Sequence, residues 1–335
     1  MMKQIDVICP VFQEEEVIDL FHGRLSAVLN DLSKRYVFHI RYVLDPSPDQ
    51  TEARLRMICR HDPRVSILVM SRRFGHEAAL VAGIDCSSAD AVIMLDSDLQ
   101  HPPEIIPEML LRWENGVDIV QAVREETRQT PAAKRITSRY FYLLFSKLGG
   151  GELPPGAADF RLLSREVVAL FRCGIREHNP FLRGLVSWVG FRVDYFPFVP
   201  GTREHGRSKY GTFTLIRLAL NGICSFSKVP LEFCIGAGLI IAALSIVGGS
   251  LQVVIYLVGT RIVPGWASLF TVVSFLSGIQ LFFLGVVGEY ISLIFDEVKG
   301  RPRYIIAQRY EGNLSSTSTA DELHPNLEIA VPLAE

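Results

Sequence analysis

Residues 91–104 read AVIMLDSDLQHPPE, and this stretch decides how the first half of the chain is interpreted. Ala91–Leu95 is apolar and partly β-branched, which is typical of a buried strand. Asp96, Asp98 and Gln100 then follow at alternate positions. Residues two apart in an extended segment face the same side, so three oxygen donors can share one face. Such donors favour Mg²⁺ or Mn²⁺, although a solvated strand end remains an alternative.

Working outward, the same strand pattern recurs at Ile5–Cys9, His39–Leu44 and Val65–Met70. Helical patterns alternate with these strands at Glu15–Leu32, Thr51–Arg60 and Glu77–Cys86. Alternating strands and helices predict an α/β domain with a parallel sheet, which binds ligands at the carboxyl ends of its strands. Polar segments follow each strand: PVFQEEE (10–16), DPSPDQT (45–51), SRRFGHE (71–77) and DSDLQHPP (96–103).

Composition excludes several classes of protein. The net charge of −2 over 335 residues gives no reason to expect a nucleic-acid partner. Six scattered cysteines without a Cys-x-x-Cys pair argue against a zinc site and against a disulfide framework. The N-terminus lacks the tripartite pattern of a cleaved signal peptide.

Two long apolar segments occupy the last third of the chain. Pro230–Gly259 contains one charge, Glu232, and Trp266–Phe295 contains one charge, Glu289. About 20 apolar residues cross a bilayer core, so we predict transmembrane helices at 230–258 and 267–295. The alternative is a pair of buried core helices.

The charges that flank these segments predict their orientation. Arg217 and Lys228 precede the first segment, and Lys299, Arg301 and Arg303 follow the second, whereas the loop between them carries only Arg261. The positive-inside rule therefore places the N-terminal domain and both termini in the cytoplasm, and makes the chain an integral membrane protein with two spans.

Two further segments resemble interfacial helices, because apolar and basic residues alternate at helical spacing in Lys134–Leu148 and Thr212–Ser227. Core packing is the alternative for the first. The predicted division is a catalytic domain at 1–210, a juxtamembrane helix at 211–229, the two spans, and a partly disordered cytoplasmic tail at 296–335.

An ordered set of motifs carries a resemblance to a known family. The set comprises PVFQEEE (10–16), SRRFGHEAALVAGID (71–85), DSDLQHPPE (96–104), DFRLLSR (159–165), FLRGLVSWVGF (181–191), REHGRSKY (203–210) and GEYISLIFDEVKGRPRY (288–304). From about residue 4 to 306, the chain resembles the family 2 polyisoprenyl-phosphate glycosyltransferases, which include dolichyl-phosphate mannose synthases and bacterial undecaprenyl-phosphate glycosyltransferases. The resemblance implies a GT-A (Rossmann-like) domain. It also implies transfer of a sugar from a UDP- or GDP-sugar to undecaprenyl or dolichyl phosphate, with Mg²⁺ or Mn²⁺ and release of a nucleoside diphosphate.

The resemblance also assigns roles to individual residues. The nucleotide-sugar set is Pro10, Phe12, Glu14, Asp45, Asp96, Ser97, Arg124, Arg203 and Lys209, with Asp45 beside the base or ribose and the three cations on phosphates. The metal set is Asp96, Asp98 and Gln100, which makes Asp98 catalytic through the metal. Asp159 is the second catalytic candidate, either as a base or as a group that positions the acceptor. A structural role for Asp159 in a salt bridge with Arg161 or in a cap, and a solvated basic loop at 203–210, are the alternatives.

One departure from the family concerns the donor. The family usually has Asp-Asp-Gly-Ser where this chain has Leu44-Asp45-Pro46-Ser47, so the acid expected to help read the base is missing. An altered-donor or non-catalytic paralogue therefore stays open, as does a glycan synthase with another lipid acceptor. A processive polysaccharide synthase is disfavoured because FLRGLVSW lacks the Gln-x-x-Arg-Trp motif, and two spans with one internal carboxylate make no transporter pathway. A homo-oligomer is compatible with the sequence.

Overall fold

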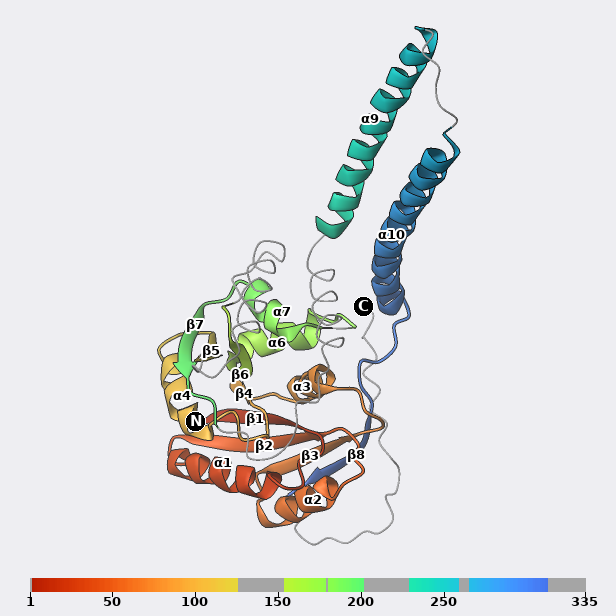
Figure 1. The fold of residues 1–335 in the computed structure, drawn as a ribbon. Coiled ribbons are helices and arrows are strands. Elements are labelled where there is room, and N and C mark those ends of the chain that lie inside the picture. Colours follow the sequence, from red (N-terminus) through yellow and green to blue (C-terminus); the bar gives the residue numbers. More distant parts are fainter. Residues whose placement is uncertain (1, 126–153, 179, 202–228, 259–264, 313–335) are drawn as a thin grey trace. The chain divides into compact units, whose positions relative to one another are not determined.

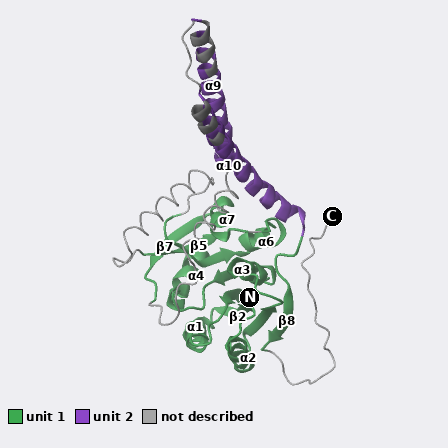
Figure 2. Ribbon diagram, turned by 45° about the vertical axis from the view of Figure 1, so that its right-hand side comes forward, with its two compact units in different colours: residues 1–146, 151–210, 301–335 green, residues 147–150, 211–300 purple. Residues whose placement is uncertain are grey.

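The structure is a computed structural model that describes residues 2–125, 154–178, 180–201, 229–258 and 265–312 (Figure 1). The chain divides into two compact units (Figure 2). Unit 1 contains residues 1–146, 151–210 and 301–335, and unit 2 contains residues 147–150 and 211–300. The two predicted interfacial helices and the REHGRSKY segment lie outside the described residues.

Unit 1 is built on one eight-stranded sheet, in the order β7-β5-β6-β4-β1-β2-β3-β8. The strands are β1 (Lys3–Val11), β2 (Tyr36–Leu44), β3 (Val65–Met70), β4 (Ala91–Met94), β5 (Ile119–Arg124), β6 (Ala157–Ser164), β7 (Val193–Phe198) and β8 (Ile306–Glu311). The four predicted strands are confirmed as β1 to β4, and they are parallel to one another. The sheet as a whole is mixed, because β6 runs antiparallel to β4 and β5, and β8 runs antiparallel to β3.

Helices cover both faces of the sheet in unit 1 (Figure 1). They are α1 (Ile18–Leu32), α2 (Thr51–His61), α3 (His76–Asp85), the short 3₁₀ turn η1 (Pro103–Ile105), α4 (Ile106–Glu114), α6 (Arg165–Cys173) and α7 (Leu182–Trp188). In α1 the buried side chains are Ile18, Phe21, Leu25 and Leu29, which recur every three or four residues. This spacing puts one apolar stripe against the sheet and confirms the helical periodicity predicted for this segment.

Strand β8 was not predicted, because its sequence IAQRYE is short and polar. It pairs with the outer side of β3, and Arg56 lies 4.4 Å from the centre of the Tyr310 ring. Just before β8, the Tyr304 hydroxyl donates a hydrogen bond to Asp85 at 3.0 Å. The segment predicted as a cytoplasmic tail therefore supplies an edge strand to the sheet of unit 1.

Unit 2 contains the helices α9 (Val229–Leu257) and α10 (Trp266–Val298). Val229–Gly248 and Phe275–Val298 within them are long and apolar enough to cross a membrane, with mean hydropathies of 2.2 and 1.7. Only 6% and 0% of these segments is buried in protein, so these residues do not form the core of a soluble domain. Exposed apolar surface of this extent requires a covering such as lipid.

The topology of the sheet determines where a ligand can bind. The chain proceeds from β1 to β2 and β3 on one side, and then returns to place β4 on the other side of β1. A crevice opens beyond the carboxyl ends of the strands at such a reversal of strand order. The segments after β1 and β4, which begin the motifs PVFQEEE and DSDLQHPPE, meet at this point.

Candidate active site

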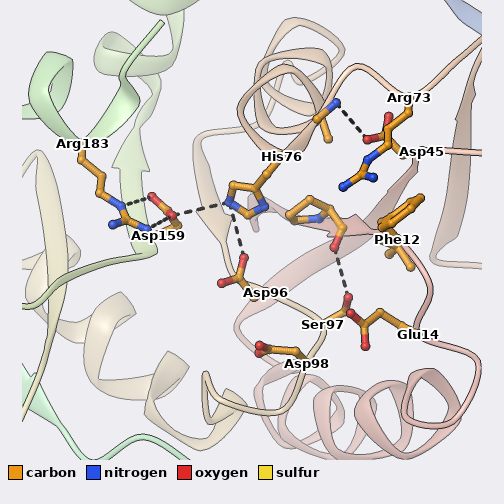
Figure 3. A pocket seen from close by; sticks show the side chains of 14 residues that line it. Phe12, Glu14, Asp45, Arg73, His76, Asp96, Ser97, Asp98, Asp159 and Arg183 are labelled. Carbon is orange, nitrogen blue, oxygen red and sulfur yellow. Dashed lines mark hydrogen bonds and ion pairs between the residues drawn. The ribbon is translucent and has the colours of Figure 1, made fainter. Parts of the chain in front are cut away.

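A cavity of about 310 Å³ lies beyond the carboxyl ends of β1 and β4 (Figure 3). Its lining residues are Pro10, Val11, Phe12, Glu14, Asp45, Arg73, Gly75, His76, Ala79, Asp96, Ser97, Asp98, Asp159 and Arg183. Phe12 and Arg73 lie at one end and Arg183 at the other, with His76 and Asp96 between them (Figure 3). The cavity therefore has two chemically different ends joined by a region rich in carboxylates.

Hydrogen bonds fix the segment that carries the carboxylates. The Ser97 hydroxyl donates to the carbonyl of Pro10 at 3.1 Å, which ties the end of β4 to the end of β1. The backbone N–H of Asp96 donates to Nδ1 of His101 at 2.9 Å, so the proton of a neutral His101 lies on Nε2. Burial lowers the pKa of His101, whose ring stacks on Phe160 with the ring centres 5.3 Å apart. The neutral, buried imidazole of His101 thus holds the backbone of Asp96 at the end of β4.

The predicted metal ligands are only partly brought together. Asp96 and Asp98 line the cavity, whereas the Gln100 side-chain oxygen accepts a hydrogen bond from Arg124 at 3.0 Å. Among the residues that the structure describes, no group of three or more His, Cys, Asp or Glu side chains is arranged to hold a metal ion. Two carboxylates facing one cavity nevertheless fit Mg²⁺ or Mn²⁺, which usually take one or two protein carboxylates and complete their shell with water and substrate phosphates.

The turn after Asp98 is strained and closely packed. Leu99 is buried and has a φ of 64°, a left-handed conformation that costs a residue with a Cβ about 1–2 kcal/mol. The N–H of Gly201 donates to the carbonyl of Gln100 at 3.1 Å, and a Cβ on Gly201 would lie 2.3 Å from the carbonyl oxygen of Leu99. Only glycine fits at position 201, which lies two residues before Arg203.

We expect Gly201→Ala to lower activity, because the new methyl group collides with the Leu99 carbonyl and must displace the turn that carries Asp98. Overpacking of this kind destabilises the local fold by about 1–3 kcal/mol, and because Asp98 sits on the displaced turn we expect a marked loss of activity. The measurement is the initial rate of transfer for the purified variant. Gly23→Ala, on the exposed side of α1 with open space around its Cα, is the matched control and should retain activity. Full activity of Gly201→Ala would show that the chain accommodates the methyl group without displacing Asp98.

The end of the cavity near Phe12 suits a planar group. The Arg73 guanidinium lies 4.0 Å from the centre of the Phe12 ring. Asp45, predicted to lie beside the base or ribose, lines this end, but its carboxylate accepts hydrogen bonds from the N–H groups of Phe74 and Gly75 at 3.0 and 2.9 Å. In the structure, Asp45 therefore holds the loop that leads into α3.

Leu44, which stands where the family usually has an acid, is fully buried in the core. It presents no polar group to the cavity. The leucine instead completes the apolar core at the end of β2.

At the other end, a buried carboxylate is surrounded by cations. Asp159 Oδ1 accepts hydrogen bonds from Arg161 Nη2 at 2.7 Å and from Arg183 Nε at 3.0 Å, and its Oδ2 pairs with Arg183 Nη2. The salt bridge predicted between Asp159 and Arg161 as an alternative role is therefore present. His76 Nε2 lies 3.5 Å from Asp159 and 3.6 Å from Asp96, so it links the two ends of the carboxylate region.

The pKa values follow from these neighbours. Burial alone would raise the pKa of Asp159, but Arg183, His76 and Arg161 hold it well below its usual range. Burial lowers the pKa of His76, yet the carboxylates of Asp96 and Asp159 outweigh this effect and raise it to about 9. Near neutral pH, the site therefore contains an ionised carboxylate flanked by three cations.

The structure brings most of the predicted residues to one cavity. Those lining it are Pro10, Phe12, Glu14, Asp45, Asp96, Ser97, Asp98 and Asp159. Gln100 and Arg124 bond to each other and do not line it, and Arg203 and Lys209 lie outside the described residues.

Sequence reasoning missed Arg73, His76 and Arg183. All three lie in motifs that the sequence did single out, SRRFGHE and FLRGLVSW. Nothing in the sequence alone distinguishes these side chains from neighbours such as Arg72.

Comparisons with known proteins show the family to which the chain belongs. The profile described as "Glycosyl transferase family 2" matches residues 6–171. The "SfII prophage-derived bactoprenol glucosyl transferase" of Shigella flexneri is 40% identical over 310 residues, which cover 92% of this chain and 99% of the relative. The "Prophage bactoprenol glucosyl transferase homolog" of Escherichia coli (strain K12) is 37% identical and covers 90% of this chain and 98% of the relative.

The fold and the family match thus define a glycosyltransferase domain of the GT-A type. The chain belongs to glycosyl transferase family 2. A crystal structure of glucosyl-3-phosphoglycerate synthase from Mycobacterium tuberculosis, in complex with Mn²⁺, UDP-glucose and phosphoglyceric acid, is 15% identical with a TM-score of 0.47. The matched region covers 66% of this chain and 78% of the synthase.

Proposed function

We propose that this glycosyltransferase moves a sugar from a nucleotide-diphosphosugar to a polyisoprenyl phosphate in the membrane and releases a nucleoside diphosphate. The observation that carries the proposal is the combination, in one chain, of the carboxylate-lined cavity with two helices of membrane-spanning length. Relatives named bactoprenol glucosyl transferases match over 90–92% of the chain, both helices included, which supports the same acceptor class.

The donor would lie with its nucleotide at the Phe12 end of the cavity and its diphosphate near the carboxylates. Phe12 and Arg73 offer a flat face to the nucleotide, and Asp96 and Asp98 lie farther along the cavity, where the diphosphate is expected. Mg²⁺ or Mn²⁺ held by Asp96 and Asp98 would neutralise the charge that develops on the leaving diphosphate. Arg124, Arg203 and Lys209 remain the proposed phosphate contacts.

The acceptor needs little activation. A phosphate monoester has a second pKa of about 6, so it is already an oxyanion near neutral pH. One of its oxygens forms the bond to the anomeric carbon as the bond from that carbon to the diphosphate breaks. The electron pair leaves with the nucleoside diphosphate, and no proton is transferred.

The test uses the purified full chain with radiolabelled UDP- and GDP-sugars, undecaprenyl phosphate and Mn²⁺, followed by extraction of lipid. We expect label in the organic phase with one donor, and only when undecaprenyl phosphate is present. The same panel identifies the nucleotide of the donor, which cannot be inferred from position 44 because the buried Leu44 offers no polar group to a base. Failure of every donor to label the lipid would refute the proposed acceptor class.

Topology is a separate prediction. We expect residues 260–265 to be the only segment exposed outside the cell, because the positive charges flank the other ends of the two helices. Pro264→Cys should react with a membrane-impermeant maleimide in intact cells, whereas Ser315→Cys should stay at the background of the wild-type chain. Labelling of Ser315→Cys would contradict a cytoplasmic C-terminus.

A further inference from the structure

Arg183 is a permanently charged side chain at the end of the cavity away from Phe12 and Arg73 (Figure 3). Its side chain is 37% exposed, whereas that of its partner Asp159 is 4% exposed. Both side chains line the cavity, Asp159 lies between Arg183 and His76, and Arg183 is the more exposed of the pair (Figure 3). A ligand that enters this end therefore finds the guanidinium of Arg183 more accessible than the carboxylate of Asp159.

The orientation of Arg183 is fixed by its pairing with Asp159. Its Nε and Nη2 atoms bond to the two oxygens of Asp159, and a two-point pair of this kind holds the guanidinium plane in one orientation. The fully buried Arg161 bonds to the same carboxylate and also donates to the carbonyl of Leu182, the residue before Arg183, at 3.3 Å. Strand β6 therefore positions both the side chain of Arg183 and the first turn of the helix that carries it.

The charge at this end suits an anion. The guanidinium groups of Arg161 and Arg183 surround the carboxylate of Asp159. The buried Glu77 belongs to the same cluster, but burial raises its pKa to about 7, so near neutral pH it carries less than a full negative charge and the cluster keeps a net positive charge next to the cavity. At the centre of the cavity, by contrast, the carboxylates of Asp96 and Asp98 repel an anion that brings no cation with it. A phosphate arriving without a metal therefore finds its favourable contact at Arg183.

We propose that Arg183 binds the phosphate of the acceptor lipid and that Asp159 is a positioning residue that aims Arg183. This inference rests on the proposed function and deepens it. A nucleophile that displaces the diphosphate approaches the anomeric carbon from the side opposite the diphosphate. Arg183 lies on that side, because Asp96 and Asp98 lie between it and the nucleotide end of the cavity (Figure 3). Asp159 already accepts hydrogen bonds from two guanidinium groups, and the acceptor oxyanion has no proton to give it.

Steady-state kinetics separates positioning from base catalysis. For Arg183→Ala we expect the KM for undecaprenyl phosphate to rise at least about tenfold, since one charge-assisted contact is lost, while the donor Kd stays within about twofold. Arg183→Lys should recover only part of the affinity, because an ammonium cannot reproduce the planar fork. Asp159→Asn should also raise the acceptor KM and keep measurable turnover at saturating acceptor.

Inorganic phosphate gives a readout that does not depend on the lipid chain. It should inhibit the wild-type enzyme competitively against undecaprenyl phosphate and inhibit Arg183→Ala more weakly. The matched control is Arg24→Ala: Arg24 is also 37% exposed and makes a two-point pair with Glu104, but it does not line the cavity. This variant should keep the wild-type KM, which shows that loss of a paired arginine is not itself the cause.

Three results would overturn the inference. In the first, Asp159→Asn abolishes turnover at saturating acceptor with an unchanged KM, as a base would. In the second, Arg183→Ala weakens donor binding and leaves the acceptor KM unchanged. In the third, inorganic phosphate inhibits both enzymes equally. Absence of transfer to undecaprenyl phosphate by the wild-type enzyme would instead refute the proposed function, so the two failures are distinguishable.

Discussion

Asp98→Asn is expected to abolish sugar transfer and leave the fold intact. Asp98 lines the cavity, and its Oδ1 accepts a hydrogen bond from the N–H of Gln100 at 3.1 Å, which an asparagine oxygen can also accept. The substitution therefore removes one negative charge at nearly constant shape. Loss of a group that stabilises developing charge costs about 10²–10³-fold in rate, and we expect a loss of at least this size.

The metal can be tested in the same experiment. EDTA should stop transfer by the wild-type enzyme, and added Mn²⁺ or Mg²⁺ should restore it. The donor Kd of Asp98→Asn should no longer respond to EDTA, which gives a readout besides activity. Asp31→Asn, on the exposed side of α1, is the control and should behave as the wild type does. Full activity in EDTA, or near-normal turnover by Asp98→Asn, would refute the assignment of Asp96 and Asp98 to a metal.

The sequence predicted the part of the fold whose pattern is local. Strands β1 to β4 are short apolar runs bounded by polar turns, and each one is confirmed within a few residues. Strand β6 was not predicted, because Asp159 and Arg161 interrupt its apolar pattern, although both are buried as an ion pair. Hydrophobic periodicity cannot detect a buried ion pair, because each charged residue taken alone predicts an exposed position.

The candidate site was predictable to a similar extent. Carboxylates at alternate positions after a strand are a local signal, so Asp96 and Asp98 were found. Arg183 comes to the same cavity from a helix more than eighty residues farther along the chain, and its role depends on Asp159 and Arg161 beneath it. Only the three-dimensional arrangement shows which of the 34 lysines and arginines line the cavity.

Arg161→Met is expected to cause the largest loss of stability among these variants. Arg161 is fully buried, and its guanidinium bonds to Asp159 at 2.7 Å, to the carbonyl of Ala158 at 3.2 Å and to the carbonyl of Leu182 at 3.3 Å. Removing one partner of a buried ion pair leaves the other charge poorly compensated and costs about 3–5 kcal/mol. Arg183 keeps part of the compensation for Asp159, and the carbonyl of Ala158 keeps its hydrogen bond from Gln121 at 2.7 Å, but the carbonyl of Leu182 loses the Arg161 donor.

The measurement is thermal or denaturant unfolding of the full chain in detergent, for Arg161→Met, Asp159→Asn and the double variant. Because both residues belong to one network, the double variant should be more stable than the sum of the single losses predicts, by about 1 kcal/mol or more. Arg24→Met removes an exposed pair and should cost about 0–1 kcal/mol. If Arg161→Met costs no more than Arg24→Met, the buried arginine does not hold β6 to α7, and the orientation of Arg183 must come from another contact.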